Sequence, residues 1–72
     1  MIHNHDLAAV RAIHEDYADD GILTGRQCTL AAWDVGEINE ALAAFLRDRA
    51  DEMDRPCHVE DVMASIYEWG NR

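Results

Sequence analysis

The sequence predicts a small all-α domain built from three principal helices. Apolar residues recur at intervals of three and four positions along three segments, and no strand-like alternation of apolar and polar residues persists. The expected helices cover residues 5–20, 35–54 and 58–69, and a fourth, short helix at 29–33 is left open. Because 72 residues hold only one core of this kind, we expect a single helical domain over residues 1–72.

The first helix is predicted from an apolar stripe near the N-terminus. The members of this stripe recur at the spacing of one helix face. They are Leu7, Val10, Ile13, His14 and Tyr17. Asn4 or Asp6 can cap the start of the helix, and Gly21 can end it, because glycine readily adopts the left-handed conformation common after a helix.

Residues 22–33 form the least regular part of the sequence. Gly25 interrupts any periodic pattern there, and Thr29 offers a cap for a short helix only. The sequence therefore leaves the structure of this segment open.

Two capping patterns mark the start of the long middle helix. Asp34 and Glu37 have the spacing of a capping box, and Trp33 and Ile38 have that of a hydrophobic staple. Pro56 ends the helix, since the residue before a proline avoids the helical conformation. An apolar stripe supports this helix and can serve either the core or a dimer interface. It contains Val35, Ile38, Leu42 and Phe45.

The third helix, at 58–69, also carries an apolar stripe. Glu60 and Asp61 fall in its first turn, where negative charge favours the helix dipole, and Gly70 follows its last turn. The stripe consists of Val59, Val62, Met63, Ile66 and Trp69.

The charge of the chain excludes whole classes of partner. It carries 15 Asp and Glu against 6 basic residues, all of them Arg, and its formal net charge is −9. An acidic surface repels the phosphates of nucleic acids and of anionic membranes. We therefore expect no direct binding of DNA or RNA and no membrane association.

The sequence also carries no recognisable targeting segment. No stretch approaches the roughly 20 apolar residues that span a bilayer, and the N-terminus lacks the cationic region of a signal peptide. We therefore expect a cytoplasmic protein in which Cys28 and Cys57 are free thiols. A single Cys28–Cys57 bridge is the alternative.

The candidate ligands and nucleophiles do not have the spacing of a metal or catalytic site. There is no C-x-x-C, no H-x-x-x-H pair on one helix face and no glycine-rich phosphate loop. A set such as Cys28, His14 and Asp34 is expected by chance in so acidic a sequence. The prediction is a non-enzymatic protein with no metal and no cofactor, and a small metal-binding protein is a less favoured alternative.

The run CTLAAWDVGEINEAL resembles the helix-turn-helix family over about fifteen residues. Ala32, Gly36 and Leu42 occupy the small, turn and apolar positions of that pattern. Glu37 and Glu40 stand where the family has polar and basic residues that meet DNA. The resemblance therefore implies a protein-binding helical hairpin rather than a helix-turn-helix regulator that reads DNA.

Acidic residues gather at the end of the first predicted helix, and we expect them to form the partner-binding site together with Tyr17. They are Glu15, Asp16, Asp19 and Asp20. Carboxylates at this end of a helix are disfavoured by its dipole, so their accumulation points to an interaction surface. The acids of the middle helix are interleaved with Arg47, Arg49 and Arg55, and are expected to be partly neutralised.

The sequence thus favours an acidic protein-interaction module that binds, and can inhibit, a basic protein that handles nucleic acid. In size and charge the chain resembles the small acidic inhibitors of phages and mobile elements, such as anti-CRISPR and DNA-mimic proteins. The alternative is a self-associating structural or regulatory module. Because many of its apolar residues are alanines, the core is thin and a homodimer could complete it.

Overall fold

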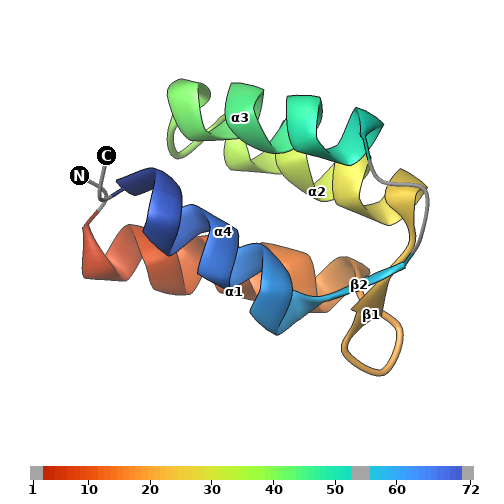
Figure 1. The fold of residues 1–72 in the computed structure, drawn as a ribbon. Coiled ribbons are helices and arrows are strands. Elements are labelled where there is room, and N and C mark those ends of the chain that lie inside the picture. The colour runs from red at the N-terminus through yellow and green to blue at the C-terminus, as the bar shows by residue number, and fades with distance from the viewer. Residues whose placement is uncertain (1–2, 53–55, 71–72) are drawn as a thin grey trace.

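The computed structural model describes residues 3–52 and 56–70 of the chain. These residues form helices and one two-stranded sheet, in an arrangement shown in Figure 1. In chain order the elements are α1 (Asn4–Tyr17), β1 (Ile22–Leu23), α2 (Gly25–Val35), α3 (Glu40–Asp51), β2 (Cys57–His58) and α4 (Val59–Gly70). The predicted all-α class is confirmed, and the last predicted helix, 58–69, matches α4 within one residue.

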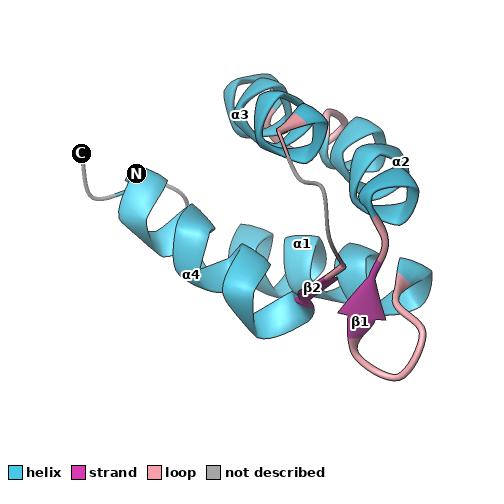
Figure 2. Cartoon of the chain, turned by 45° about the vertical axis from the view of Figure 1, so that its right-hand side comes forward, coloured by secondary structure: helices cyan, strands magenta, loops and turns pink. Residues whose placement is uncertain are grey.

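The helices lie in two layers. Helices α1 and α4 form one layer, and the hairpin of α2 and α3 forms the other (Figures 1 and 2). Apolar side chains from both layers meet in one cluster between them, and its most deeply buried members include Val10, Leu23, Leu42 and Ile66. The core is therefore shared among all the helices and β1.

The two strands join segments that are far apart in the sequence. Strand β1 pairs antiparallel with β2, with Ile22 opposite His58 and Leu23 opposite Cys57. The backbone N–H of Val59 extends the pairing by donating to the carbonyl of Gly21 at 3.0 Å. The ladder fastens the chain just before α2 to the chain just before α4, so it closes the base of the α2–α3 hairpin (Figure 2).

The first helix ends three residues earlier than the predicted 5–20. Asp19 and Ile22 exchange two backbone hydrogen bonds, of 2.8 and 3.1 Å, across a tight turn. Asp20 and Gly21 make this turn with φ angles of 57° and 79°. Positive φ at both central residues is the geometry of a hairpin turn that matches strand twist, for which Asp-Gly is a favoured pair. The chain therefore leaves α1 at Tyr17 in order to enter β1.

The predicted helix over 35–54 and the capping box at Asp34 are wrong. A capping box does exist, but it lies ten positions earlier, where the Thr24 hydroxyl accepts from the backbone N–H of Gln27 at 3.2 Å. The Gln27 side chain accepts in return from the backbone N–H of Thr24 at 2.7 Å. These bonds start α2 at Gly25, so the segment 29–33 lies inside a longer helix rather than forming a short one.

Helix α3 is separate because the chain reverses at residues 36–39. The backbone N–H groups of Ile38 and Asn39 both donate to the Val35 carbonyl, which closes α2. The Asn39 side chain then accepts from the backbone N–H of Leu42 at 3.1 Å and caps α3. At Gly36 a Cβ atom would lie 3.1 Å from the Trp33 carbonyl oxygen, so glycine permits this close return. Helix α3 ends at Asp51, and the predicted end at residue 54 lies outside the described residues.

The capping box at Thr24 generates a stability prediction. We expect Thr24→Ala to lower the free energy of unfolding by about 1 kcal/mol, because the Gln27 N–H loses its acceptor at a helix start. Thermal unfolding followed by circular dichroism measures this change. Thr29→Ala is the control: its hydroxyl bonds only to the Gly25 carbonyl inside α2, so its loss changes stability little. Equal losses in both variants would contradict the capping role.

Candidate functional site

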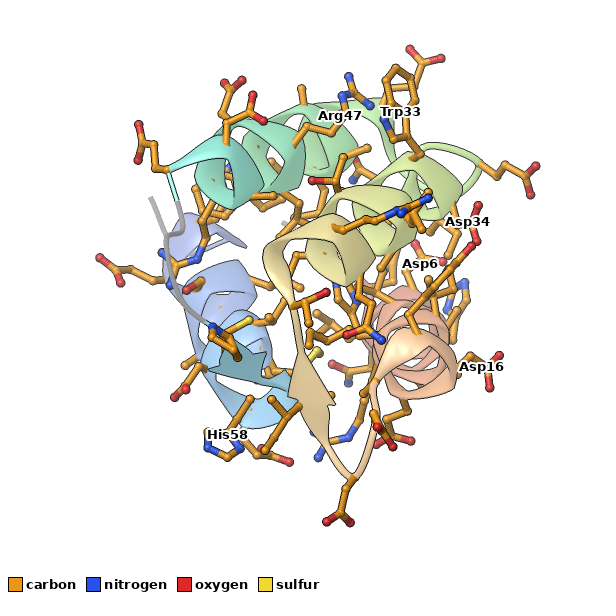
Figure 3. The ribbon with its side chains drawn as sticks, turned by 90° about the vertical axis from the view of Figure 1, so that its right-hand side faces the viewer. Asp6, Asp16, Trp33, Asp34, Arg47 and His58 are labelled. Atoms are coloured by element: carbon orange, nitrogen blue, oxygen red, sulfur yellow. The ribbon has the colours of Figure 1, made fainter. Side chains whose placement is uncertain are left out.

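The acidic side chains cover the surface of the protein. Within residues 3–52 and 56–70 every Asp and Glu is exposed except Asp6, which is partly buried. In the same part of the chain, Glu15 and Glu60 are the carboxylates that pair with an arginine. The surface therefore presents mostly negative charge that no arginine neutralises, and the labelled side chains of Asp16 and Asp34 lie on it in Figure 3.

The structure divides the predicted acidic cluster between two elements. Glu15 and Asp16 lie in the last turn of α1, whereas Asp19 and Asp20 lie in the tight turn that follows. The unfavourable helix dipole therefore acts on the first two alone, because the effect is confined to the last turn. All four side chains are exposed, so they remain available to a partner.

Arg11 compensates part of this cluster. Its Nε atom donates to Glu15 at 3.1 Å, and its Nη2 atom donates to Glu60 on α4. The hydrogen bond to Glu60, followed by that to Glu15, raises the pKa of the Arg11 guanidinium. Arg11 thus links α1 to α4, and Asp16, Asp19 and Asp20 are left as the unpaired members of the cluster.

Tyr17 is held by a neighbour rather than projecting freely. Its hydroxyl donates to Asp34 Oδ2 at 2.7 Å, and this bond raises the pKa of the Tyr17 phenol. The contact joins the last turn of α1 to the last turn of α2. It brings Asp16 and Asp34 to the same side of the molecule (Figure 3).

An open groove lies at the turn between α2 and α3, within the segment that resembles a helix-turn-helix and that is expected to form a protein-binding helical hairpin. It has a volume of about 510 Å³ and is lined by Trp33, Gly36, Glu37, Glu40 and Arg47. Trp33 is 61% exposed, and the Arg47 guanidinium lies 4.3 Å from the centroid of its ring (Figure 3). The groove therefore combines a large exposed aromatic surface with two carboxylates.

If residues 25–35 are taken as one helix, the sequence pattern predicts that Trp33 is exposed. The buried residues of α2 recur at the spacing of one face, and they are Cys28, Ala31, Ala32 and Val35. Trp33 falls off that face, so the helix directs it to solvent.

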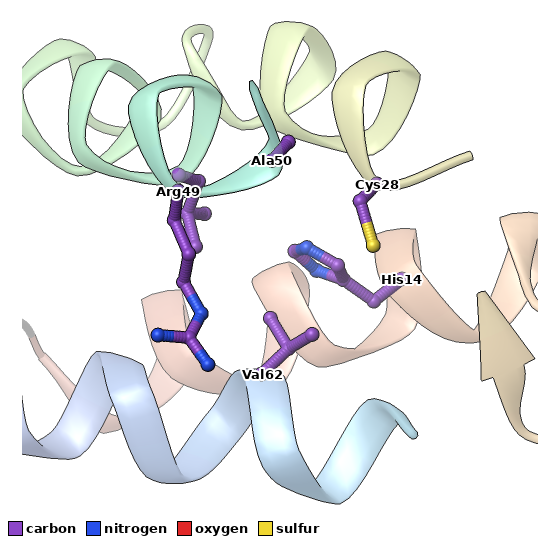
Figure 4. A pocket seen from close by; sticks show the side chains of 6 residues that line it. His14, Cys28, Arg49, Ala50 and Val62 are labelled. Atoms are coloured by element: carbon purple, nitrogen blue, oxygen red, sulfur yellow. The ribbon is translucent and has the colours of Figure 1, made fainter. Parts of the chain in front are cut away.

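The two described arginines of α3 contact groups other than its acids. Arg47 lies over Trp33, and Arg49 extends inward toward α4, where its Nε atom is buried without a hydrogen-bond partner (Figure 4). Neither arginine forms an ion pair with a carboxylate in the described part of the chain. Arg55, the third arginine of the predicted set, lies outside the described residues, so the expected partial neutralisation stays a prediction.

The apolar stripe predicted for the middle helix packs within the chain. Val35 and Leu42 are fully buried, although they lie on different helices, and Ile38 and Phe45 pack against the same core. The stripe thus serves the core of the single chain. Self-association stays a prediction with no observation in its favour.

A small buried cavity lies between the two layers (Figure 4). It measures about 10 Å³ and is lined by His14, Cys28, Leu46, Arg49, Ala50 and Val62. The His14 side chain is 1% exposed, and its Nδ1–H donates to the Val10 carbonyl at 2.8 Å, which leaves Nε2 unprotonated in the neutral ring. Since this volume holds at most one water molecule, the cavity has no room for a substrate.

Two further kinds of site were considered from the sequence, a metal site and a helix-turn-helix surface. The described residues contain no group of three or more His, Cys, Asp and Glu side chains close enough to hold a metal ion. The helix-turn-helix positions fall as the resemblance implies, with Ala32 and Leu42 buried and Gly36 in the turn. Helix α3 nevertheless presents Glu40, Asp48 and other acids outward, which repel a DNA backbone.

Within residues 3–52 and 56–70, no helix is both long and apolar enough to cross a membrane.

Comparison of the chain with protein-family models, with curated proteins and with solved structures gives no significant match.

The burial of His14 generates a prediction about pH. Burial lowers the pKa of His14 below its ordinary value near 6.5, and Arg49, which lines the same cavity, adds no favourable partner for an imidazolium. As the pH falls below 6.5, the unfolded chain takes up a proton that the folded chain resists. We expect stability to fall by up to about 1.4 kcal/mol per pH unit from this group, until the pH reaches the folded pKa.

Chemical denaturation between pH 7 and pH 5 measures this effect. His14→Leu replaces the imidazole with an apolar side chain of similar size and removes the titrating group. The free energy of unfolding of this variant should change less between pH 7 and pH 5 than that of the native chain. Identical pH dependence in both proteins would show that His14 does not control it.

Proposed function

We propose that this chain is a non-enzymatic acidic interaction module that binds a basic protein segment in the groove at the α2–α3 turn. The observation that carries the proposal is the exposed Trp33 ring beside two unpaired carboxylates, Glu37 and Glu40, in an open groove. A cationic segment with aliphatic side-chain stems fits both features. The aromatic ring supplies apolar contact area, and the carboxylates supply charge complementarity.

The contact between Arg47 and Trp33 illustrates how the groove would bind its partner. A guanidinium already lies over the ring at 4.3 Å, so the indole is placed to accept a cation. An arginine or lysine of the partner would stack on exposed indole surface or displace Arg47. Glu37 and Glu40 would then pair with the incoming charge.

The charge of the whole chain supports the same proposal at longer range. A net charge of −9, with most described carboxylates exposed and unpaired, attracts a basic partner and repels an acidic one. The predicted cluster at the end of α1 would act here as a second region of negative potential, through Asp16, Asp19 and Asp20.

Basic protein surfaces commonly bind nucleic-acid phosphates, so a module that occupies such a surface would compete with nucleic acid. The finer proposal is therefore an inhibitor of a nucleic-acid-handling protein, in the manner of a DNA mimic. It rests on the sign and the exposure of the charge. The cytoplasmic location and the absence of catalysis remain predictions from the sequence.

A defined probe tests the proposal without knowledge of the natural partner. Fluorescent nona-arginine is titrated with the full chain, and anisotropy is read at low and at physiological ionic strength. We expect binding that weakens with salt, because exposed charges are screened. Trp33→Ala should weaken it at least about fivefold through loss of the cation–aromatic contact, and Glu37→Gln with Glu40→Gln should weaken it and reduce the salt dependence.

Matched controls come from α4, which contributes no lining residue to the groove. Tyr67 is 53% exposed, so Tyr67→Ala removes an exposed aromatic, and Glu68→Gln removes an exposed carboxylate. Both should change binding less than about twofold if the groove is specific. Absence of binding at low ionic strength would overturn the proposed function. Loss of binding with Asp16→Asn and Asp19→Asn, but not with Trp33→Ala, would move the site to the end of α1.

A further inference from the structure

The two cysteines lie in direct contact although they are 29 positions apart. The Sγ atoms of Cys28 and Cys57 are separated by 3.2 Å, and both thiols are free. Cys28 lies in the first turns of α2, and Cys57 is the first residue of β2. Their exposed fractions are 6% and 8%, so the pair is enclosed by the protein.

Two local structures hold the sulfur atoms at this separation. The β1–β2 ladder places Cys57 directly opposite Leu23. The capping box at Thr24 and Gln27 starts α2 immediately after Leu23, so Cys28 follows within one turn. The backbone N–H of Cys28 donates to the Thr24 carbonyl at 2.9 Å, which fixes that turn. The contact is therefore built into the fold and does not depend on a flexible segment.

We propose that Cys28 and Cys57 are a redox-active pair that closes to a disulfide by exchange with a low-molecular-weight disulfide, and that the bond fastens the α2–α3 hairpin at its base. A disulfide has an S–S length of about 2.05 Å, so the sulfur atoms must approach by about 1 Å. Small side-chain rotations supply such a movement. This inference stands apart from the proposed function, because it concerns the core rather than the groove.

The chemistry proceeds in two exchange steps. One protein thiolate attacks a sulfur of the small disulfide, which forms a mixed disulfide and releases one small thiolate. The second protein thiolate then attacks the protein sulfur of the mixed disulfide, which forms the Cys28–Cys57 bond and releases the second small thiolate. Two electrons pass from the protein to the small disulfide, and the two protons of the protein thiols end on the released thiols.

The surroundings of the pair make this reaction slow in the folded state. Burial, together with the hydrogen bond to Cys57, raises the pKa of Cys28 to about 12, and the nearby Arg49 charge opposes that rise only in part. The thiolate is the reactive form, so attack requires opening of the base of the hairpin. The reduced pair therefore resists chance oxidation, and closure follows the opening of β2 or a rise in pH.

The bond would act on the segment that carries the groove. Helices α2 and α3 both lie between the two cysteines in the sequence, so closure turns this hairpin into a covalent loop. A closed loop loses freedom in the unfolded chain, which stabilises the folded form. The strands already hold the loop ends together, so the folded backbone would change little.

The test uses the full native chain. The protein is incubated with oxidised glutathione at mildly alkaline pH, alkylated, and digested without reduction for mass spectrometry. We expect an internal Cys28–Cys57 crosslink in the monomer and a melting midpoint raised by roughly 10 °C, with both changes reversed by dithiothreitol. The Cys28–Cys57 crosslink should form faster at a low concentration of denaturant, because the two thiols become accessible when the base of the α2–α3 hairpin opens.

Variants separate the bond from other thiol chemistry. Cys28→Ala and Cys57→Ala should each give no internal crosslink and no rise in midpoint under the same treatment. If either variant fails to fold, the deciding measurement is whether dithiothreitol reverses the crosslink and the rise in melting midpoint of the native chain. The proposal is overturned if oxidation of the native chain yields only glutathione adducts or linked dimers, or if the internal bond lowers the melting midpoint.

Discussion

The antiparallel pairing of β1 with β2 is the contact that ties the two layers of this protein together. It is only two residues long on each strand, yet it joins the chain before α2 to the chain before α4. Leu23, which pairs with Cys57, is fully buried, so the ladder also contributes to the core. The direction in which the α2–α3 hairpin leaves the core, and the meeting of the two cysteines, both follow from this ladder (Figure 2).

The arginines explain why so much negative charge stays unpaired. Arg11 links α1 to α4, Arg47 lies on the Trp33 ring, and Arg49 extends into the interior. Each of these side chains makes a contact within the fold, so few arginines among the described residues are left to neutralise the other carboxylates. The composition alone leaves an excess of nine acidic residues, and the placement of Arg47 and Arg49 away from carboxylates adds to the unpaired negative charge of the surface.

The capping signals show where reasoning from sequence succeeds and where it fails. The periodic stripes of α1 and α4 predict those helices well, because each helix has one clear buried face. Two candidate capping boxes occur in the middle of the chain, at Thr24 with Gln27 and at Asp34 with Glu37, and local pattern does not rank them. Burial decides between them, because a turn at residues 36–39 lets Val35 on α2 and Leu42 on α3 pack into the same core.

The features of the candidate site also fall into two groups, those that the sequence predicts and those that depend on tertiary contacts. The acidity of the chain and its helical class are set by composition and by spacing between near neighbours, so they can be read directly from the amino acids. The groove beside Trp33 and the contact of Cys28 with Cys57 result from the α2–α3 reversal and the β1–β2 ladder. Those features join residues that are distant in the chain, and such pairings are selected by which apolar surfaces bury together.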